Sequence, residues 1–395
     1  MKIALIHNAY TIRGGEERTV AFERALLERA GHDVCIYEVH NTDLHGSPVR
    51  AARTALSAPW SRRSYRAVRA FLERERPDIG HVHNWFPSIS PSVYAAHHDA
   101  GIPVVQTLHN YRLGCARGTY LRNGQHCDLC VTESRMHAVR NRCYRDSAVQ
   151  SGVWCRVMGR AWGNGTFQRG VDAYIAPSQV VAEQHLAMGL PADRMHVIPH
   201  ACEDPGDLAN DRGARDGALY VGRLVPEKGV ETAIAAWRDI QMPLRIIGTG
   251  PSESELRRAA AGQSHIEFLG ERSHAEVLEA MKRARLLVFP SRWDEPFGLT
   301  IIEAMACGTP ILASHTGAVP ELLTGSGGGW CVPPGNVDAL HRMAGALSLS
   351  PTVLGEAGQR ARVHWEQRFA PDRHRERLLR VFEDVRRAHA EGACA

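Results

Sequence analysis

The sequence predicts an α/β protein made of two facing Rossmann-like domains, each with a parallel sheet between layers of helices. Three observations lead to this prediction. The chain has 395 residues, more than one hydrophobic core usually supports. Short apolar runs alternate with stretches of helical period, which is the pattern of a parallel sheet. A polar, glycine-containing stretch at 204–217 divides this alternation into two series, so we interpret it as the interdomain linker.

The first series starts with a strand at 2–7, followed by a helix that opens at Gly14-Gly15 and keeps its apolar period until Gly31. A strand at 34–37 completes a βαβ unit. Further strands are expected at 79–83, 104–108 and 173–176. We assign residues 1–205 to this domain, with a Cys-rich insertion at about 111–146.

The second series occupies 206–370. Its buried strands are expected at 218–221, 244–247, 266–268, 286–289 and 310–313. Helices are expected between and after them at 229–240, 253–261, 276–282, 299–307 and 337–347. A last helix follows in 371–395.

Charge and hydropathy limit which binding partners and which cellular compartment we expect for this protein. The net charge of +4 does not indicate a nucleic-acid partner. The apolar start is too short for a signal peptide, and no run of about 18 apolar residues occurs, so we expect a cytoplasmic protein. The segment 50–76 is rich in arginine and interleaved with apolar residues. A basic amphipathic helix at 65–74 would suit an anionic membrane on its inner face, although a solvated helix face or an acidic polysaccharide acceptor fits equally well.

Two acidic residues stand at the edge of the second predicted sheet. Glu295 follows the strand at 286–289, and Glu303, eight positions later, lies in the next helix. In doubly wound sheets ligands bind at the carboxyl ends of the strands, where carboxylates can hold the hydroxyl groups of a ribose or a hexose. Two solvated acids near a helix start are the alternative, because the helix dipole favours negative charge there.

A basic loop precedes these acids. Gly222, Arg223 and Lys228 lie between the strand at 218–221 and the helix that follows. Backbone N–H groups and the helix dipole favour anions at such a position, and a pyrophosphate is the natural ligand. The alternative is that both cations are ordinary surface charges.

Together, the Gly-Arg-Leu-x-x-x-Lys-Gly segment at 222–229 and the Glu-x7-Glu pair at 295–303 resemble the motifs of retaining nucleotide-sugar glycosyltransferases of family 4, which have the GT-B fold. The resemblance covers nearly the whole chain and is most specific in the second domain. It implies a donor-binding second domain, an acceptor-side first domain and a last helix that returns to the first domain. It requires no cofactor for catalysis.

The resemblance also implies roles for individual residues. Arg223 and Lys228 would stabilise the donor diphosphate as it leaves, Glu295 would orient sugar hydroxyls, and Glu303 would hold the ribose. His109, at the end of the strand at 104–108, would act at the donor sugar. Asn110 follows it where the family more often has Asp. The remaining donor-binding residues implied in this way are Gly14, Gly15, Gly222, Gly248, Gly250, Phe268, Leu269, Phe297, Gly298 and Leu299, although a glycine pair such as 14–15 also fits a plain tight turn.

The cysteines form a separate motif. Cys115, Cys127, Cys130 and Cys143 gather in the insertion after His109, and four thiolates with a C-x2-C pair suit a structural zinc. An iron–sulfur cluster and unligated or redox-active thiols are the alternatives. His81 and His83 share one face of their strand, but two histidines alone do not make a metal site. The other cysteines are expected to be small buried residues: Cys35, Cys155, Cys202, Cys307, Cys331 and Cys394.

The sequence therefore predicts sugar transfer from a nucleoside diphosphate donor to a glycan or lipid-linked acceptor, in surface polysaccharide or glycolipid synthesis. A non-hydrolysing nucleotide-sugar epimerase of the same architecture is the first alternative, and a non-catalytic sugar-nucleotide-binding subunit is the second. A dinucleotide oxidoreductase is disfavoured because no clear G-x-G-x-x-G follows the first strand.

Overall fold

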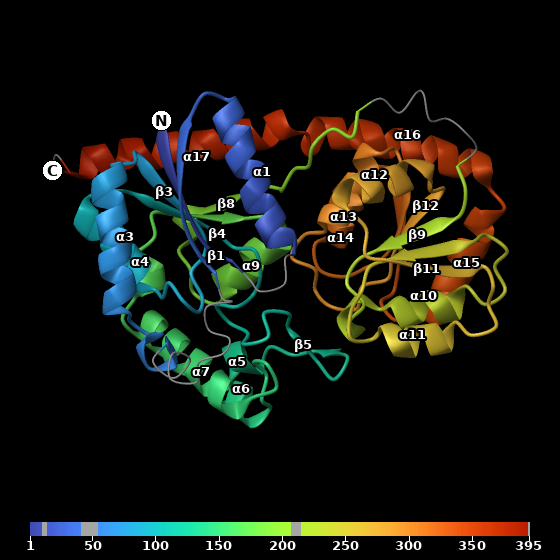
Figure 1. Ribbon diagram of the computed structural model, residues 1–395, viewed down its shortest axis with the longest axis horizontal. Helices are drawn as coiled ribbons and strands as arrows, with labels where there is room; N and C mark the ends of the chain where they lie inside the picture. Colours follow the sequence, from blue (N-terminus) through green and yellow to red (C-terminus); the bar gives the residue numbers. More distant parts are fainter. Residues whose placement is uncertain (10–13, 41–53, 207–214, 394–395) are drawn as a thin grey trace. The chain divides into compact units, whose positions relative to one another are not determined.

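The computed structural model describes residues 1–9, 14–40, 54–206 and 215–393 (Figure 1). The chain forms two compact units. Unit 1 consists of Met1–Tyr120, Cys127–Ile198 and Arg375–Ala395, and unit 2 of Leu121–His126 and Pro199–His374. Each unit contains a six-stranded parallel sheet with helices, so the predicted architecture of two Rossmann-like domains is confirmed. Arg50, Arg53 and most of the predicted linker lie outside the described residues.

The sheet of unit 1 has the order β2-β1-β3-β4-β7-β8. Every strand predicted from the sequence is present, and the short edge strand β8 is the additional one. The bounds are β1 (Lys2–Ala9), β2 (Asp33–His40), β3 (Ile79–Asn84), β4 (Val104–Thr107), β7 (Ala173–Ala176) and β8 (Met195–Val197).

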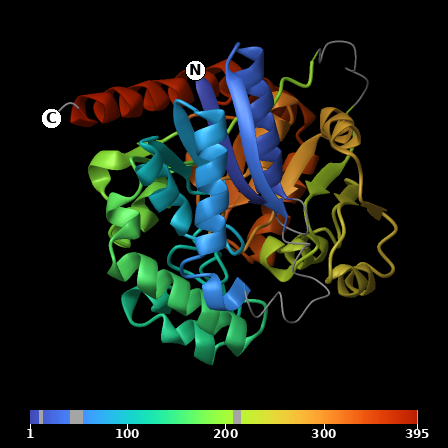
Figure 2. The same ribbon diagram turned by 60° about the vertical axis from the view of Figure 1, so that its left-hand side comes forward.

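The helices of unit 1 cover this sheet. Its C-terminal helix α17 supplies Leu378, Val381 and Phe382 to the core formed by Ile3 and Leu5 of β1. Figure 2 shows this helix in red beside the first strand in deep blue. The helices are α1 (Gly15–Arg29), α3 (Arg62–Glu75), α4 (Ser92–Ala100), α7 (Ala148–Gly163), α8 (Thr166–Arg169), α9 (Gln179–Ala187), η2 (Ala192–Arg194) and α17 (Pro371–Ala393).

The Cys-rich insertion is anchored by aromatic side chains at its base. Tyr111 and Tyr120 are buried with their ring centroids 4.9 Å apart. Trp154 and Trp162 of α7 donate indole N–H bonds of 3.0 Å to the carbonyls of Arg112 and Leu113. The insertion contains a hairpin of β5 (Leu121–Arg122) and β6 (Gln125–His126), then the short helices α5 (Leu129–Thr132) and α6 (Met136–Arg140).

The sheet of unit 2 has the order β11-β10-β9-β12-β13-β14, so the direction of strand succession reverses between β9 and β12. Ligands bind at such a switch point in open α/β sheets. The strands are β9 (Ala218–Val221), β10 (Leu244–Ile247), β11 (Ile266–Gly270), β12 (Leu286–Phe289), β13 (Ile311–Ser314) and β14 (Gly329–Val332). The helices are η3 (Pro226–Lys228), α10 (Val230–Ala236), α11 (Glu253–Ala259), α12 (His274–Arg283), α13 (Leu299–Ala306), α14 (Val319–Leu323), α15 (Val337–Ser348) and α16 (Pro351–Arg368).

No helix in the described part of the chain is both long and apolar enough to cross a membrane.

Candidate active site

A pocket lies at the switch point of unit 2, between the ends of β9 and β12. Its lining includes Gly222 and Lys228 from the first loop and Ser291 from the second. The two loops touch at Gly229, which has φ +66° and whose Cβ, if present, would lie 2.1 Å from the carbonyl oxygen of Pro290. Only glycine allows this approach, which places Lys228 beside the end of β12.

Glu295 is held beside this pocket by three donors on one carboxylate oxygen, two of which, Lys228 and Ser291, line the pocket. Its Oε1 accepts from Lys228 Nζ at 2.6 Å, Ser291 Oγ at 2.7 Å and Trp293 Nε1 at 2.8 Å. The residue is only 4% exposed, so these bonds replace the water that a carboxylate would otherwise bind. The structure therefore brings Lys228 and Glu295 together.

A glycine on a third loop fixes the backbone of Glu295. Gly317, after β13, has φ +52°, and a Cβ there would lie 2.3 Å from the backbone nitrogen of Glu295. Ala318 N–H donates to the carbonyl of Glu295 at 2.8 Å. Sequence reasoning missed this loop. A glycine three positions beyond Ser314, the last residue of a strand at the same sheet edge, was the signal available.

Glu303 lies within α13 and is 1% exposed. Its Oε1 is 3.1 Å from Nε2 of His274, the first residue of α12, which the sequence did not single out. Before it, Phe297 is buried with its ring 5.1 Å from that of His200, and Gly298 has φ +134°. Leu299 then opens α13.

Arg223 is exposed on the loop after β9. The hydroxyl of Tyr220, at the base of this loop, donates to the Arg223 carbonyl at 3.0 Å. Burial raises the pKa of Tyr220, and the charge of Glu295 adds to the shift, so this tyrosine stays a neutral donor. Tyr220 thus braces the loop that carries the arginine.

The glycines after β9 and β10 interlock. A Cβ on Gly248 would lie 1.9 Å from the carbonyl oxygen of Gly222, and one on Gly250 would lie 2.3 Å from that of Leu224. Close backbone approach therefore explains glycine at both positions. Phe268 and Leu269 are half-buried near the end of β11, and the guanidinium of Arg257 lies 4.7 Å from the Phe268 ring.

The remaining predicted site residues lie in unit 1. Gly14 precedes α1, and its N–H donates to Glu17 Oε2 at 2.8 Å, while Gly15 is the first residue of the helix. His109 follows β4 and lines a second pocket with His83, Asn84 and Thr107 at the ends of β3 and β4. His83 Nδ1 and His109 Nε2 are 3.0 Å apart.

Cys115, Cys127, Cys130 and Cys143 are all half-buried. Burial and the four neighbouring thiols of Cys115, Cys143, Cys155 and Cys127 raise the pKa of Cys130 to about 12. Cys155, which the sequence grouped with scattered cysteines, thus belongs to this cluster. Thiols that resist ionisation in isolation become thiolates on a zinc ion, so the donor set fits zinc chemically. Within the described residues, however, the ligand atoms that all lie within 4.8 Å of one another are those of Glu23, His81 and His83.

Comparison with known proteins identifies the family. The family model described as Glycosyltransferase Family 4 matches residues 13–203, and that described as Glycosyl transferases group 1 matches 212–362. A GDP-mannose-dependent monoacylated α-(1-6)-phosphatidylinositol monomannoside mannosyltransferase of Corynebacterium glutamicum is 28% identical over 51% of this chain and 56% of its own length. A glycogen synthase of Mycobacterium tuberculosis is 30% identical over 75% of this chain and 65% of its own length. The chain spans between about a third and two thirds of the length of the curated relatives it matches first.

Solved structures share the whole fold at low identity. A sucrose-phosphate synthase from Thermosynechococcus elongatus has a TM-score of 0.70 and 19% identity, covering 98% of this chain and 99% of its own. HepE from Anabaena, solved in complex with UDP, has a TM-score of 0.65 and 19% identity, covering 97% of this chain and 100% of its own. With both halves matched and the two-sheet architecture shared, the chain belongs to glycosyltransferase family 4.

Proposed function

We propose that this protein transfers a sugar from a nucleoside diphosphate donor to a glycan or lipid-linked acceptor, with retention of the anomeric configuration. The observation that carries the proposal is the Lys228–Glu295 pair at the switch point of unit 2, beside the loop of Arg223. The names of relatives support the substrate class and a role in glycolipid or polysaccharide synthesis, since they include a phosphatidyl-myo-inositol mannosyltransferase and an amylovoran biosynthesis glycosyltransferase.

The pair has a specific use in this reaction. Negative charge develops on the diphosphate as it leaves, and the cations of Arg223 and Lys228 would stabilise it in a partly buried pocket. Lys228 would then exchange its carboxylate partner for a phosphate oxygen. The three donors from the described residues converge on Oε1 of Glu295, so Oε2 is the oxygen that would accept a sugar hydroxyl.

The other residues would position the substrates. Glu303 would bind the ribose, the backbone at Phe268-Leu269 the base, and His109 would act at the donor sugar. Holding the acceptor hydroxyl close to the anomeric carbon then supplies much of the rate enhancement without a covalent step on the protein. No cofactor enters this scheme.

Lys228→Ala and Glu303→Ala test the site. Each is expected to lower turnover of a nucleoside diphosphate sugar at least a hundredfold while the protein stays folded, because each removes a charge that would bind the donor directly. A screen of such donors by thermal shift identifies the one to use, since a bound donor raises the melting temperature.

Lys282→Ala is the matched control. Lys282 also pairs with a glutamate in unit 2, Glu279, at 2.9 Å, but it does not line the pocket. Unchanged turnover in Lys228→Ala would refute the site.

The stereochemistry of the reaction is tested separately. NMR of the product anomer tests retention of configuration, and deuterium entering the sugar from solvent would indicate an epimerase instead.

We also propose that the basic face of α3 in unit 1 binds an anionic membrane surface. On α3 and at its end, Arg62, Arg63, Arg66, Arg74 and Arg76 are exposed, and Trp60 precedes them with 37% exposure. Such a basic face with an aromatic residue suits an anionic lipid surface, where lipid-linked acceptors reside. Co-sedimentation with phosphatidylglycerol vesicles should fail for Arg62→Glu/Arg63→Glu/Arg66→Glu, and equal binding of this variant would refute the proposal.

A further inference from the structure

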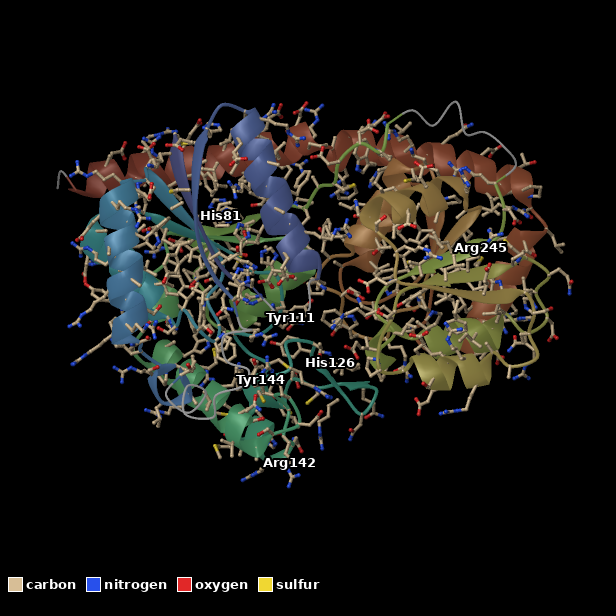
Figure 3. The ribbon with its side chains drawn as sticks, viewed as in Figure 1. His81, Tyr111, His126, Arg142, Tyr144 and Arg245 are labelled. Atoms are coloured by element: carbon tan, nitrogen blue, oxygen red, sulfur yellow. The ribbon has the colours of Figure 1, made fainter. Side chains whose placement is uncertain are left out.

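We infer that Glu23, His81 and His83 form a buried binding site for a divalent transition-metal ion, with Zn²⁺ as the first candidate. His81 and His83 lie two residues apart on β3 and therefore project from one face of the strand. Glu23 comes from α1 and brings a carboxylate to that face. His81, labelled in Figure 3, lies in the interior of unit 1.

The distances fit a shared ion. Glu23 Oε2 is 3.5 Å from His81 Nδ1 and 3.5 Å from His83 Nε2, and the three ligand atoms all lie within 4.8 Å of one another. With metal bonds of about 2.0–2.2 Å, atoms on the edge of a tetrahedron are about 3.3–3.6 Å apart. A direct bond between a charged imidazole and a carboxylate would bring nitrogen and oxygen to about 2.7–2.9 Å.

Burial favours the same interpretation. The exposures of His81, His83 and Glu23 are 0%, 3% and 1%. A cation at short range stabilises a carboxylate that is enclosed to this degree. Two neutral imidazoles and one carboxylate are a donor set that Zn²⁺ uses in proteins, and an ion bound there supplies the charge.

The second nitrogen of each ring is already oriented. His81 Nε2 is 2.7 Å from Thr107 Oγ1, and His83 Nδ1 is 3.0 Å from His109 Nε2. Metal-binding histidines usually donate their other N–H to such an acceptor, which fixes the tautomer. Coordination through Nε2 would keep the proton of His83 on Nδ1, where it donates to His109. The ion would thus also set the orientation of a predicted site residue.

Metal content tests the inference in the intact chain. The variant Cys127→Ser/Cys130→Ser removes the thiolate pair of the cysteine cluster, so any zinc there no longer contributes. After equilibration with Zn²⁺ and removal of excess, elemental analysis of this folded variant should find about one equivalent. Adding Glu23→Gln should lower its zinc affinity at least tenfold. Co²⁺ in place of Zn²⁺ should show the visible absorption of a tetrahedral nitrogen and oxygen site.

His185→Leu is the matched control, because His185 is another fully buried histidine of unit 1, hydrogen-bonded to the Val181 carbonyl at 2.7 Å, and it should leave the zinc content unchanged. If the cysteine variant does not fold, a mercurial reagent applied to the wild-type protein displaces thiolate-bound zinc, and one equivalent should resist it. Absence of metal from the folded cysteine variant, loss of all zinc to the mercurial, or full affinity in Glu23→Gln would each overturn the inference.

Discussion

At the scale of single residues, the unusual group is the carboxylate of Glu295, because one of its oxygens accepts three hydrogen bonds in a nearly buried position. Only one of the three donors, Lys228, carries a charge, and its side chain is 19% exposed. Lys228 also lies 5.3 Å from the ring centroid of Trp293, which adds a cation–π contact. Among these three donors, the pairing of Glu295 with a positive charge therefore depends on this lysine.

A double-mutant cycle measures this dependence. Lys228→Met should lower the free energy of unfolding by about 1–3 kcal/mol, since it leaves a carboxylate with neutral donors alone. In a Glu295→Gln background the same change should cost markedly less, because a neutral amide needs no cation. Urea unfolding of the four proteins gives the coupling energy, and additive effects of the two substitutions would contradict this account.

The motifs in the sequence predict Arg223, Lys228, Glu295 and Glu303 as site residues because their spacing is local to two strand-to-helix loops and the helix α13 that follows the second. The residues that contact these side chains in the folded protein cannot be predicted in the same way. His274 is 29 positions from Glu303, and its contact depends on how α12 packs on α13. Glu23 likewise belongs to an ordinary helical pattern until β3 brings two histidines beneath it. Contacts of this kind follow from tertiary packing, which residue types alone do not encode.

At the scale of elements, three loops meet at one sheet edge, and glycines decide how closely they meet. The strands of this edge were predictable, since β9, β10 and β12 have the bounds that their apolar runs indicate. The strands β8 and β14 were not predicted, because each is short and lies at a sheet edge: β8 has three residues with a histidine in the middle, and β14 has four residues and begins with glycine. The loop after β13 supports Glu295 through backbone contacts, which leave little trace in the sequence.

Two glycine substitutions distinguish the effect of a steric clash with Glu295 from the effect of a left-handed backbone conformation alone. Gly317 and Gly325 have φ of +52° and +73°, but a Cβ would clash with the Glu295 backbone only at Gly317, since nothing lies within 4 Å at Gly325. Gly325→Ala should cost about 1–2 kcal/mol of stability from the left-handed conformation alone. Gly317→Ala should cost more and weaken donor binding at least tenfold, as measured by calorimetric titration. Equal donor affinities in the two variants would show that this loop does not position Glu295.

At the scale of the whole molecule, unit 1 buries neutral histidines, and their protonation at low pH should destabilise it. Burial lowers the pKa of His97 and of His185 from 6.5 to about 4. Between these values the unfolded chain binds protons that the folded unit excludes, so stability is complete above about pH 6.5 and decreases as the pH falls toward 4.

Acidification should therefore destabilise unit 1. From pH 7.5 to pH 5 each of these two histidines should cost roughly 2 kcal/mol, since one pKa unit corresponds to about 1.4 kcal/mol. His185→Leu should make the dependence on pH shallower by one histidine's share. Chemical denaturation at several pH values measures the slope, and an unchanged slope in this variant would mean that His185 is not buried in its neutral form.

The packing of α17 orders events during biosynthesis. Residues from Arg375 onward complete the core of unit 1, whereas unit 2 ends at His374. A ribosome therefore completes unit 2 before it releases the last segment of unit 1. Until then the core around Ile3 and Leu5 lacks Leu378, Val381 and Phe382, so a stop codon placed before Leu378 should leave the core of unit 1 incomplete while every residue of unit 2 is still made.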